Sequence, residues 1–229
     1  MLEVSNLHVS YGQSEALHGI SFTAAKNETV AIMGRNGMGK TTLFKSLIGI
    51  LPLKSGAIAI DGQDISHEES YRRVAKGIAY VPQGRMIFPT LTVEENIQTG
   101  LENARHKRIP DEIYALFPVL FDMRRRKGGN LSGGQQQQLA IARALVTDPK
   151  VLLLDEPTEG IQPSVIKDIA RALHEIRKMR EITIIVSEQV LNFAMDVADR
   201  LFVIEGGLLV HENSRADTDT AHIKQYLSV

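Results

Sequence analysis

The sequence predicts an α/β fold: helices covering a largely parallel sheet, an antiparallel β layer near the N-terminus, and an inserted α-helical subdomain. Residues 151–154 and 182–186 are largely apolar, as expected of strands buried on both faces of a sheet. A helical pattern from 164 to 179 separates them, which is typical of a doubly wound fold. Residues 2–10 alternate apolar and polar residues, so that strand should bury one face. From residue 91 onward the pattern changes to short helices.

The composition limits the classes of function. With 229 residues, 43% of them hydrophobic, the chain can form a packed core. Its formal net charge of −1 gives no field that would attract nucleic acid or anionic lipid. The chain has no cysteine, which excludes disulfides and thiolate metal sites, and its histidines form no i, i+4 pair of the zinc-binding kind. We expect one domain over 1–229, with a core of 1–90 and 131–229 and a helical insert at 91–130.

Three further strands and one helix are predicted between residues 30 and 81. Residues 30–33 form an apolar strand, and 42–48 have helical spacing. Residues 56–62 read as a strand that ends in a turn, which suits the antiparallel layer. Residues 78–81 form a further strand that Pro82 ends.

Capping signals mark the helices that follow. Residues 92–95 form a capping box, and the Pro-Asp-Glu segment at 110–112 opens a second helix. Ser132 is expected to be the N-cap of a longer helix that reaches Leu145 and ends before Pro149.

The C-terminal part should close the sheet. Residues 201–204 and 208–210 are apolar and flank the turn at 205–207. This spacing predicts a β-hairpin.

Residues 34–41 match a phosphate-binding loop. The pattern is Gly, four residues, then Gly-Lys-Thr, in which backbone N–H groups surround phosphates, Lys40 reaches the β- and γ-phosphates, and Thr41 places a hydroxyl on Mg²⁺. A glycine-rich turn is the alternative. A strand before the loop and a helix after it favour phosphate binding, because they deliver the phosphate to a helix N-terminus. The candidate residues in the loop are Gly34, Asn36, Gly37, Gly39, Lys40 and Thr41.

Two acidic residues follow the apolar strand at 151–154. Asp155 and Glu156 stand at its carboxyl end, where ligands of open α/β sheets bind. Asp155 is expected to hold Mg²⁺ and Glu156 to polarise an attacking water, because phosphoryl transfer needs a metal and an oriented nucleophile. A solvated strand end is the alternative, which the phosphate loop disfavours.

A second candidate anion site lies at residues 131–135. This Leu-Ser-Gly-Gly-Gln segment combines a hydroxyl, two glycines and a helix N-terminus. One phosphate does not need two such sites in one chain. We therefore expect a dimer in which each ATP lies between two chains.

Together with Gln83, which follows the strand at 78–81, these motifs resemble those of the ABC (ATP-binding cassette) ATPase family over nearly the whole chain. The resemblance implies a P-loop NTPase core and the cofactors ATP and Mg²⁺. It makes Lys40, Thr41 and Thr42 contacts to phosphate and Mg²⁺, and Glu156 the general base. It adds Gln83 as γ-phosphate sensor and completes a metal set of Thr41, Gln83 and Asp155.

The resemblance assigns two further groups of contacts. Ser132, Gly133, Gly134 and Gln135 correspond to residues that contact the partner subunit's ATP. Tyr11 lies where the family keeps an aromatic side chain that stacks on adenine, although a tyrosine after a strand can also serve plain packing.

Two segments depart from the commonest family pattern. Gln189 stands where many members have a histidine that touches the γ-phosphate; it can donate a hydrogen bond but cannot become cationic. With Gln189, the candidate catalytic set is Lys40, Gln83, Glu156 and Gln189. Residues 160–162 read Gly-Ile-Gln in place of Ala-Leu-Asp. Both departures resemble importers of branched-chain amino acids and related amides, and residues 78–89 are most similar to the smaller ATP-binding subunit of urea importers.

The resemblance implies an ATP-hydrolysing subunit that powers an importer for urea, branched-chain amino acids or a related small amide. Its partners would be a second copy or a related ATP-binding subunit, integral membrane permease subunits and, indirectly, a periplasmic or extracellular solute-binding protein. The implied location is peripheral, on the cytoplasmic face of the inner (plasma) membrane.

Three alternatives stay open at this point. They are a soluble ABC ATPase acting on DNA or ribosomes, an ABC exporter subunit, and a P-loop kinase, which would share Lys40 and Thr41 but give no reason for residues 131–135. The basic run 124–127 reads as a solvated loop, because no aromatic residues interleave it, and we expect no nucleic-acid partner. The apolar segment 84–89 could dock a partner or pack in the core.

Overall fold

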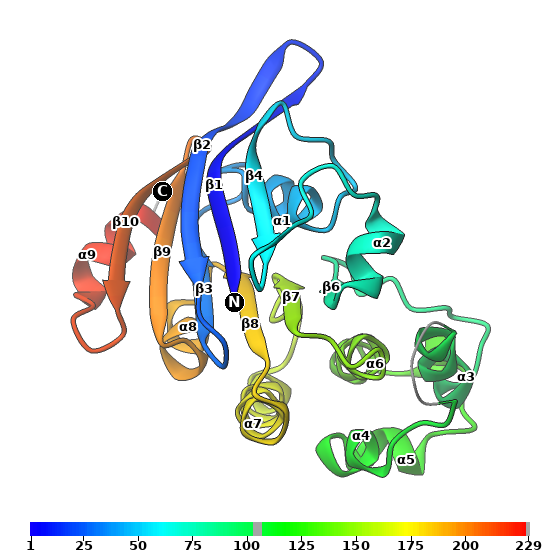
Figure 1. Ribbon diagram of the computed structural model, residues 1–229. Coiled ribbons are helices and arrows are strands. Elements are labelled where there is room, and N and C mark those ends of the chain that lie inside the picture. Colours follow the sequence, from blue (N-terminus) through cyan, green and yellow to red (C-terminus); the bar gives the residue numbers. More distant parts are fainter. Residues whose placement is uncertain (103–106, 228–229) are drawn as a thin grey trace.

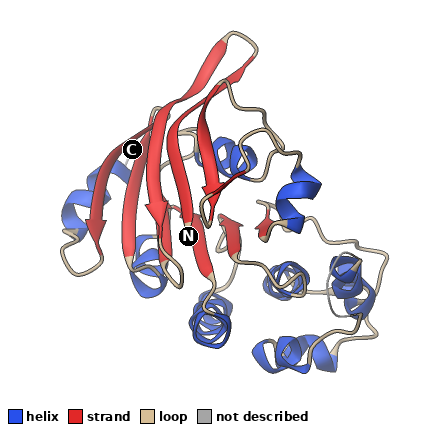
Figure 2. Cartoon of the chain, viewed as in Figure 1, coloured by secondary structure: helices blue, strands red, loops and turns tan. Residues whose placement is uncertain are grey.

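A computed structural model describes residues 1–102 and 107–227, which form two sheets with helices packed around them (Figure 1; Figure 2). The smaller sheet has the strand order β2-β1-β4-β5 and is antiparallel throughout. Its strands are β1 (Leu2–Tyr11), β2 (Ser14–Ala24), β4 (Ser55–Ile60) and β5 (Gln63–Asp64). This is the antiparallel layer expected near the N-terminus.

The larger sheet has the strand order β10-β9-β3-β8-β7-β6. Its strands are β3 (Thr29–Met33), β6 (Ile78–Val81), β7 (Val151–Asp155), β8 (Thr183–Glu188), β9 (Arg200–Glu205) and β10 (Leu208–Ser214). All pairs are parallel except the edge hairpin β9–β10, which confirms the predicted hairpin.

The helices lie on both faces of the larger sheet, and one group of them is formed by the chain segment that connects β6 to β7. They are α1 (Lys40–Leu47), α2 (Ser70–Ala75), α3 (Val93–Gln98), η1 (Thr99–Leu101), α4 (Asp111–Leu116), α5 (Pro118–Asp122), η2 (Gly128–Asn130), α6 (Gly133–Leu145), α7 (Pro163–Arg180), α8 (Leu191–Val197) and α9 (Thr220–Leu227). In Figure 1, α3, α4 and α5 lie beyond α6, away from the antiparallel sheet. Within the described residues, no helix has the length and apolar content needed to cross a membrane.

Alternation along the buried strands divides the core in two. Successive side chains of a strand point to opposite faces. In β7, Val151 and Leu153 therefore pack with α1 and the antiparallel sheet, whereas Leu152 and Leu154 pack with α6, α7 and α8. The larger sheet is thus covered on both faces, as its apolar strands predicted.

The sequence signals for helix starts are confirmed. Thr92 Oγ1 accepts a hydrogen bond from Glu95 N at 3.2 Å, and Thr92 N donates to Glu95 Oε2 at 2.7 Å, which completes the capping box of α3. Ser132 is the N-cap of α6 and forms a capping box with Gln135.

Strand β2 and helices α2, α8 and α9 were not predicted. In β2 the inward residues are Leu17, Ile20, Phe22 and Ala24, and a register shift against β1 leaves two residues between the first two. The strict alternation of apolar and polar residues is therefore lost in β2, so the sequence pattern did not predict a strand there. A second shift, in β1 between Val4 and Leu7, includes Asn6, whose φ is 48°, and brings Leu7 into the core after Val4.

Arg73 of α2 fixes the far end of α1. It is 2% exposed. Its Nη1 donates to the carbonyls of Ser46 and Leu47 at 2.8 and 2.9 Å, and Nη2 and Nε donate to those of Ser66 and Glu68, each at 2.8 Å. The last carbonyls of a helix lack partners within the helix, so this guanidinium supplies them.

Replacing Arg73 should destabilise the fold far more than replacing its neighbour. Arg73→Met leaves several buried carbonyls unpaired and is expected to lower the free energy of unfolding by at least about 3 kcal/mol. Arg72→Met, at a side chain 62% exposed, should change it by less than about 0.5 kcal/mol. Urea unfolding of both variants is the measurement. Equal losses would show that the buried guanidinium is not needed.

Candidate active site

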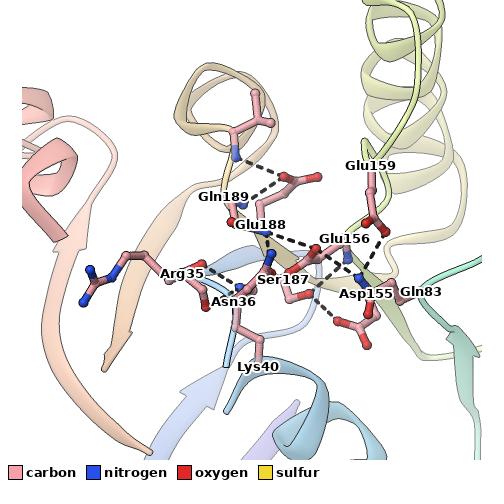
Figure 3. Close-up of polar contacts among 12 residues, drawn as sticks. Arg35, Asn36, Lys40, Gln83, Asp155, Glu156, Glu159, Ser187, Glu188 and Gln189 are labelled. Carbon is pink, nitrogen blue, oxygen red and sulfur yellow. Dashed lines mark hydrogen bonds and ion pairs between the residues drawn. The ribbon is translucent and has the colours of Figure 1, made fainter. Parts of the chain in front are cut away.

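The site lies where four parallel strands of the larger sheet end side by side. In the order β3-β8-β7-β6, Met33 pairs with Glu188, and Asp155 pairs with Ser187. The loops that leave these strands carry residues 34–39, Gln189, Glu156 and Gln83. Figure 3 shows side chains from all four converging. The carboxyl ends of parallel strands are the usual ligand-binding edge of such sheets.

A cleft of about 300 Å³ occupies this edge. Its lining consists of Asn36, Gly37, Gly39, Lys40, Thr41, Thr42, Gln83 and Glu156, all of which the sequence analysis had singled out. Gly39 has φ of 109°, and a Cβ there would lie 2.9 Å from a Leu17 side-chain carbon. A Cβ on Gly34 would lie 2.6 Å from the Ile204 carbonyl oxygen. Glycine is therefore required at both positions for the loop to pack against the sheet.

Lys40 begins α1 and points back under the loop. Its side chain is 3% exposed. Nζ donates to the carbonyls of Gly34 and Arg35 at 2.6 and 2.9 Å and forms an ion pair with Glu156 Oε1 at 2.9 Å. A buried ammonium with three acceptors is fully satisfied. Its charge lies at the floor of the cleft, beside the N-terminus of α1.

Glu156 is held in a strained backbone conformation. Its φ is 47°, in the left-handed region that few residues other than glycine adopt. Its backbone N–H donates to the carbonyl oxygen of Ser187 at 3.1 Å and to the Ser187 hydroxyl at 3.0 Å. The carboxylate accepts from Lys40 at Oε1, and from Gln189 Nε2 (3.2 Å) and Gln83 Nε2 (3.4 Å) at Oε2. Such strain clusters at functional sites.

Asp155 lies behind Glu156 and is 1% exposed. Ser187 Oγ donates to Asp155 Oδ1 at 2.6 Å, and the Tyr80 hydroxyl donates to Oδ2 at 3.1 Å. Burial, with the neighbouring Asp155 charge, raises the pKa of Tyr80, so the hydroxyl stays protonated and keeps donating. Asp155 is outside the lining of the cleft.

The oxygen donors at this edge suit Mg²⁺. Thr41 offers a hydroxyl, Gln83 an amide oxygen and Asp155 a carboxylate, which is the hard-donor set that this ion prefers. Thr41 and Gln83 line the same cleft. The predicted metal-binding residues therefore fit the ion by the chemistry of their donor atoms, and two of the three line the cleft.

Gln189 bridges the loop and Glu156. Besides its bond to Glu156, Nε2 donates to Asn36 Oδ1 at 2.8 Å. A neutral amide thus joins two residues of the cleft lining.

Tyr11 lies beside α1 with half of its surface free. The side chain is 51% exposed, and its hydroxyl is 3.3 Å from Thr42 Oγ1. An exposed ring next to the phosphate loop can offer a face to a base.

Residues 132–135 are not brought to this cleft, whose described lining includes none of them. Ser132 is exposed at the start of α6, where its hydroxyl accepts from Gln135 N at 3.4 Å. Gly134 has a packing role, because a Cβ there would lie 2.7 Å from Val165 of α7.

Four contributing residues were missed by the sequence analysis: Tyr80, Glu159, Ser187 and Glu188. Ser187 and Glu188 are the last residues of β8. The rule that singled out Asp155, polar residues at the carboxyl end of an apolar strand, would have found both. Glu159 accepts from Gln83 Nε2 at 3.1 Å and follows no strand, so no pattern marked it.

Comparison with protein families identifies the chain. The family model described as ABC transporter matches residues 17–159, which include the phosphate loop, Gln83, residues 131–135 and the Asp155-Glu156 pair. The chain belongs to the ABC transporter family. It is an ABC-type ATP hydrolase and an ATPase subunit of a transporter, as the sequence resemblance implied.

Curated relatives match it almost end to end. The high-affinity branched-chain amino acid transport ATP-binding protein BraG of Pseudomonas aeruginosa is 38% identical over 219 residues, 94% of each chain. A probable branched-chain amino acid transport ATP-binding protein, LivF of Archaeoglobus fulgidus, is 35% identical and covers 90% of this chain and 89% of its own. The lipopolysaccharide export system ATP-binding protein LptB of Haemophilus influenzae is 34% identical, covering 92% of this chain and 89% of its own.

Solved structures share the fold of this ABC ATPase. MJ1267, an ATP-binding cassette of an ABC transporter, superposes with a TM-score of 0.82 at 28% identity over 98% of both chains. The ATP-binding cassette MJ0796 superposes with a TM-score of 0.84 over 94% of this chain and 99% of its own, at 24% identity. These matches confirm the predicted fold class.

Removing the charge of Glu156 should stop turnover but not binding. Glu156→Gln keeps the shape of the cleft and is expected to lower ATP hydrolysis by about a hundredfold or more, as loss of a general base does. Nucleotide affinity should stay within a few-fold. Steady-state hydrolysis and equilibrium nucleotide binding are the measurements.

Glu159→Gln is the matched control for this prediction. It removes a nearby carboxylate that accepts from Gln83 but does not touch Lys40. Its turnover should fall by less than about tenfold. If Glu156→Gln hydrolysed ATP at the wild-type rate, the carboxylate of Glu156 would have no role in the mechanism.

Proposed function

We propose that this chain powers import of branched-chain amino acids, urea or a related small amide by binding and hydrolysing ATP with Mg²⁺. The observation that carries the proposal is Gln189, whose amide donates to both Asn36 and Glu156. By the sequence resemblance, Gln189 stands where many members of the family have a histidine. In this departure from the commonest family pattern, the chain resembles the importers of branched-chain amino acids and related amides. The 38% identity to BraG over 94% of both chains supports the same group.

In the proposed mechanism, the residues of the cleft divide the work of hydrolysis. The backbone N–H groups of residues 34–41 and the N-terminus of α1 hold the phosphates. Lys40 leaves Glu156 to contact the β- and γ-phosphates, which frees one carboxylate oxygen. Glu156 then orients and deprotonates the water, while Gln83 and Gln189 fix its position and that of the γ-phosphate. Mg²⁺, held by Thr41, Gln83 and Asp155, would neutralise charge on the phosphate oxygens.

We propose that the working unit is a dimer with shared sites. Ser132 and Gln135 stand at the exposed start of α6, outside the cleft of their own chain. A helix N-terminus with an exposed hydroxyl suits a phosphate carried by a second copy or by a related ATP-binding subunit. Tyr11 would stack on adenine at the open side of the cleft.

A docking surface for membrane permease subunits is proposed at residues 84–89. Met86 is 69% and Phe88 48% exposed, and they line a groove of about 470 Å³. Arg143 of α6 donates to the Met86 carbonyl at 2.8 Å and lies over the Phe88 ring at 5.4 Å. The segment is therefore tied both to Gln83 and to the helix that begins at Ser132.

The proposal also covers the domain organisation, the location and the indirect partners of the chain. The chain acts as one ABC ATPase domain over residues 1–229, in which the helical insert at 91–130 moves against the core at 1–90 and 131–229. It works at the cytoplasmic face of the inner membrane, as a peripheral subunit. A solute-binding protein outside the membrane contributes indirectly, and nucleic acid is not a partner.

Export is the second candidate, because the LptB relative is 34% identical over 92% of this chain. Purifying the native complex and identifying its membrane subunits separates the two directions. Permeases that carry radiolabelled amino acid or urea inward support the proposal, and subunits that carry lipid outward contradict it.

Complementation tests the shared sites. Lys40→Ala removes a phosphate contact, and Ser132→Arg fills the second anion site, so each homodimer should be inactive. Mixed dimers keep one composite site intact and should recover a measurable part of the wild-type hydrolysis rate. With mixed assembly verified, activity no higher than that of either homodimer would overturn the shared-site model.

Phe88→Ser tests the docking surface. The variant should weaken association with the permease subunits and lower transport, while basal hydrolysis by the isolated chain stays within about twofold, because exposed apolar side chains contribute more to partners than to the core. Phe121→Ser is the matched control, since Phe121 is equally exposed at 48% but lies on α5. Equal losses of transport and basal hydrolysis, with a lower melting temperature, would make Phe88 a core residue.

A further inference from the structure

The buried carboxylate of Glu188 has no part in the mechanism above. Glu188 ends β8, is 2% exposed, and lies between the segment after Glu156 and the segment that carries Gln189. Burial raises its pKa, and its hydrogen bonds oppose that rise. A carboxylate in such a position costs stability unless its oxygens are paired.

The two oxygens of Glu188 serve two different loops. Oε1 accepts from the backbone N–H of Thr158 at 3.1 Å and from its hydroxyl at 2.7 Å. Oε2 accepts from the backbone N–H groups of Gln189 and Val190 at 3.0 and 3.1 Å. All four partners are donors, and an ionised carboxylate offers about four acceptor positions. The group is therefore fully used, and neither an amide nor an apolar side chain can replace all four contacts.

These contacts complete a closed ring of residues that includes Glu156. Thr158 lies two residues after Glu156 in the chain, and Glu188 joins it to the backbone of Gln189. The Gln189 side chain then returns to Glu156 Oε2 at 3.2 Å. The position of the Gln189 amide relative to Glu156 thus depends on Glu188, which touches neither the cleft nor the carboxylate of Glu156 directly.

We propose that Glu188 is a positioning residue for hydrolysis, which ties Thr158 to the backbone of Gln189 and so fixes the Gln189 amide against Glu156. The inference rests on the proposed roles of Glu156 and Gln189. It also connects residues 158–162, which lead into α7, to Gln189. The two segments are joined through one buried carboxylate.

Two substitutions remove this tie from opposite sides. Glu188→Gln keeps the size of the side chain but turns an amide N–H₂ toward N–H donors. Thr158→Val keeps the shape of Thr158 but deletes its hydroxyl. Each should lower kcat about tenfold and leave KM for ATP within about twofold, because the loss of a charge-assisted hydrogen bond is of the order that changes a rate tenfold. Thr158→Ser restores the hydroxyl and should recover most of the lost kcat.

The matched control is a buried hydroxyl at the other end of the same strand. Thr183 begins β8, is 1% exposed, and donates to the carbonyl of Ala25 at 2.7 Å. Thr183→Val should lower the melting temperature without changing kcat. If Thr158 and Glu188 act through one contact, the double variant Thr158→Val/Glu188→Gln should lose about tenfold in kcat, whereas independent effects would multiply to about a hundredfold.

Amide hydrogen exchange of the full chain without nucleotide tests the tie separately from catalysis. Glu188→Gln should speed exchange at the N–H groups of Gln189 and Val190 by at least about fivefold, and Thr183→Val should not. Unchanged exchange, or a lowered melting temperature with wild-type kcat, would overturn the inference. If Glu156→Gln retained full hydrolysis, the proposed role of Glu156 would fail, while the exchange rates would still decide whether Glu188 holds the loop.

Discussion

The buried ion pair between Lys40 and Glu156 is the contact on which the rest of the site depends. It joins the phosphate loop to the acidic end of β7 at 2.9 Å, and both side chains are less than a tenth exposed. A buried charge is stable only when it is paired, so each residue needs the other or a substitute. A phosphate offers Lys40 such a substitute. In the proposed mechanism, this exchange of partners would release Glu156 at the same step that places the phosphate, and so would link nucleotide binding to activation of the base.

The strand order of the larger sheet brings the residues of this ion pair and their neighbours together at one edge. Because β3, β8, β7 and β6 are adjacent, segments up to about 150 residues apart in the chain meet at one edge. Ser187 shows the consequence, since its hydroxyl contacts both Asp155 and the backbone of Glu156. The left-handed conformation of Glu156 is thereby held by neighbouring strands rather than by local sequence.

The fold and much of the cleft could be predicted from the sequence because their causes are local. Glycine spacing, capping boxes at Thr92 and Ser132, and apolar strands each leave a short pattern, and the cleft lining matches the predicted residues. The features that the sequence did not predict depend on contacts between residues far apart in the chain. The register shift in β2 breaks alternation, and the partners of Glu188 lie on two other segments. No spacing along the chain records such pairings.

The position of Lys40 with nucleotide bound tests the central claim most directly. A crystal structure of the chain with Mg²⁺ and a non-hydrolysable ATP analogue should place Lys40 Nζ within hydrogen-bond distance of the β- and γ-phosphates. Glu156 Oε1 should then face the line of attack on the γ-phosphate, with Gln189 still donating to this carboxylate or to the phosphate. An intact Lys40–Glu156 pair beside a bound triphosphate would contradict the account.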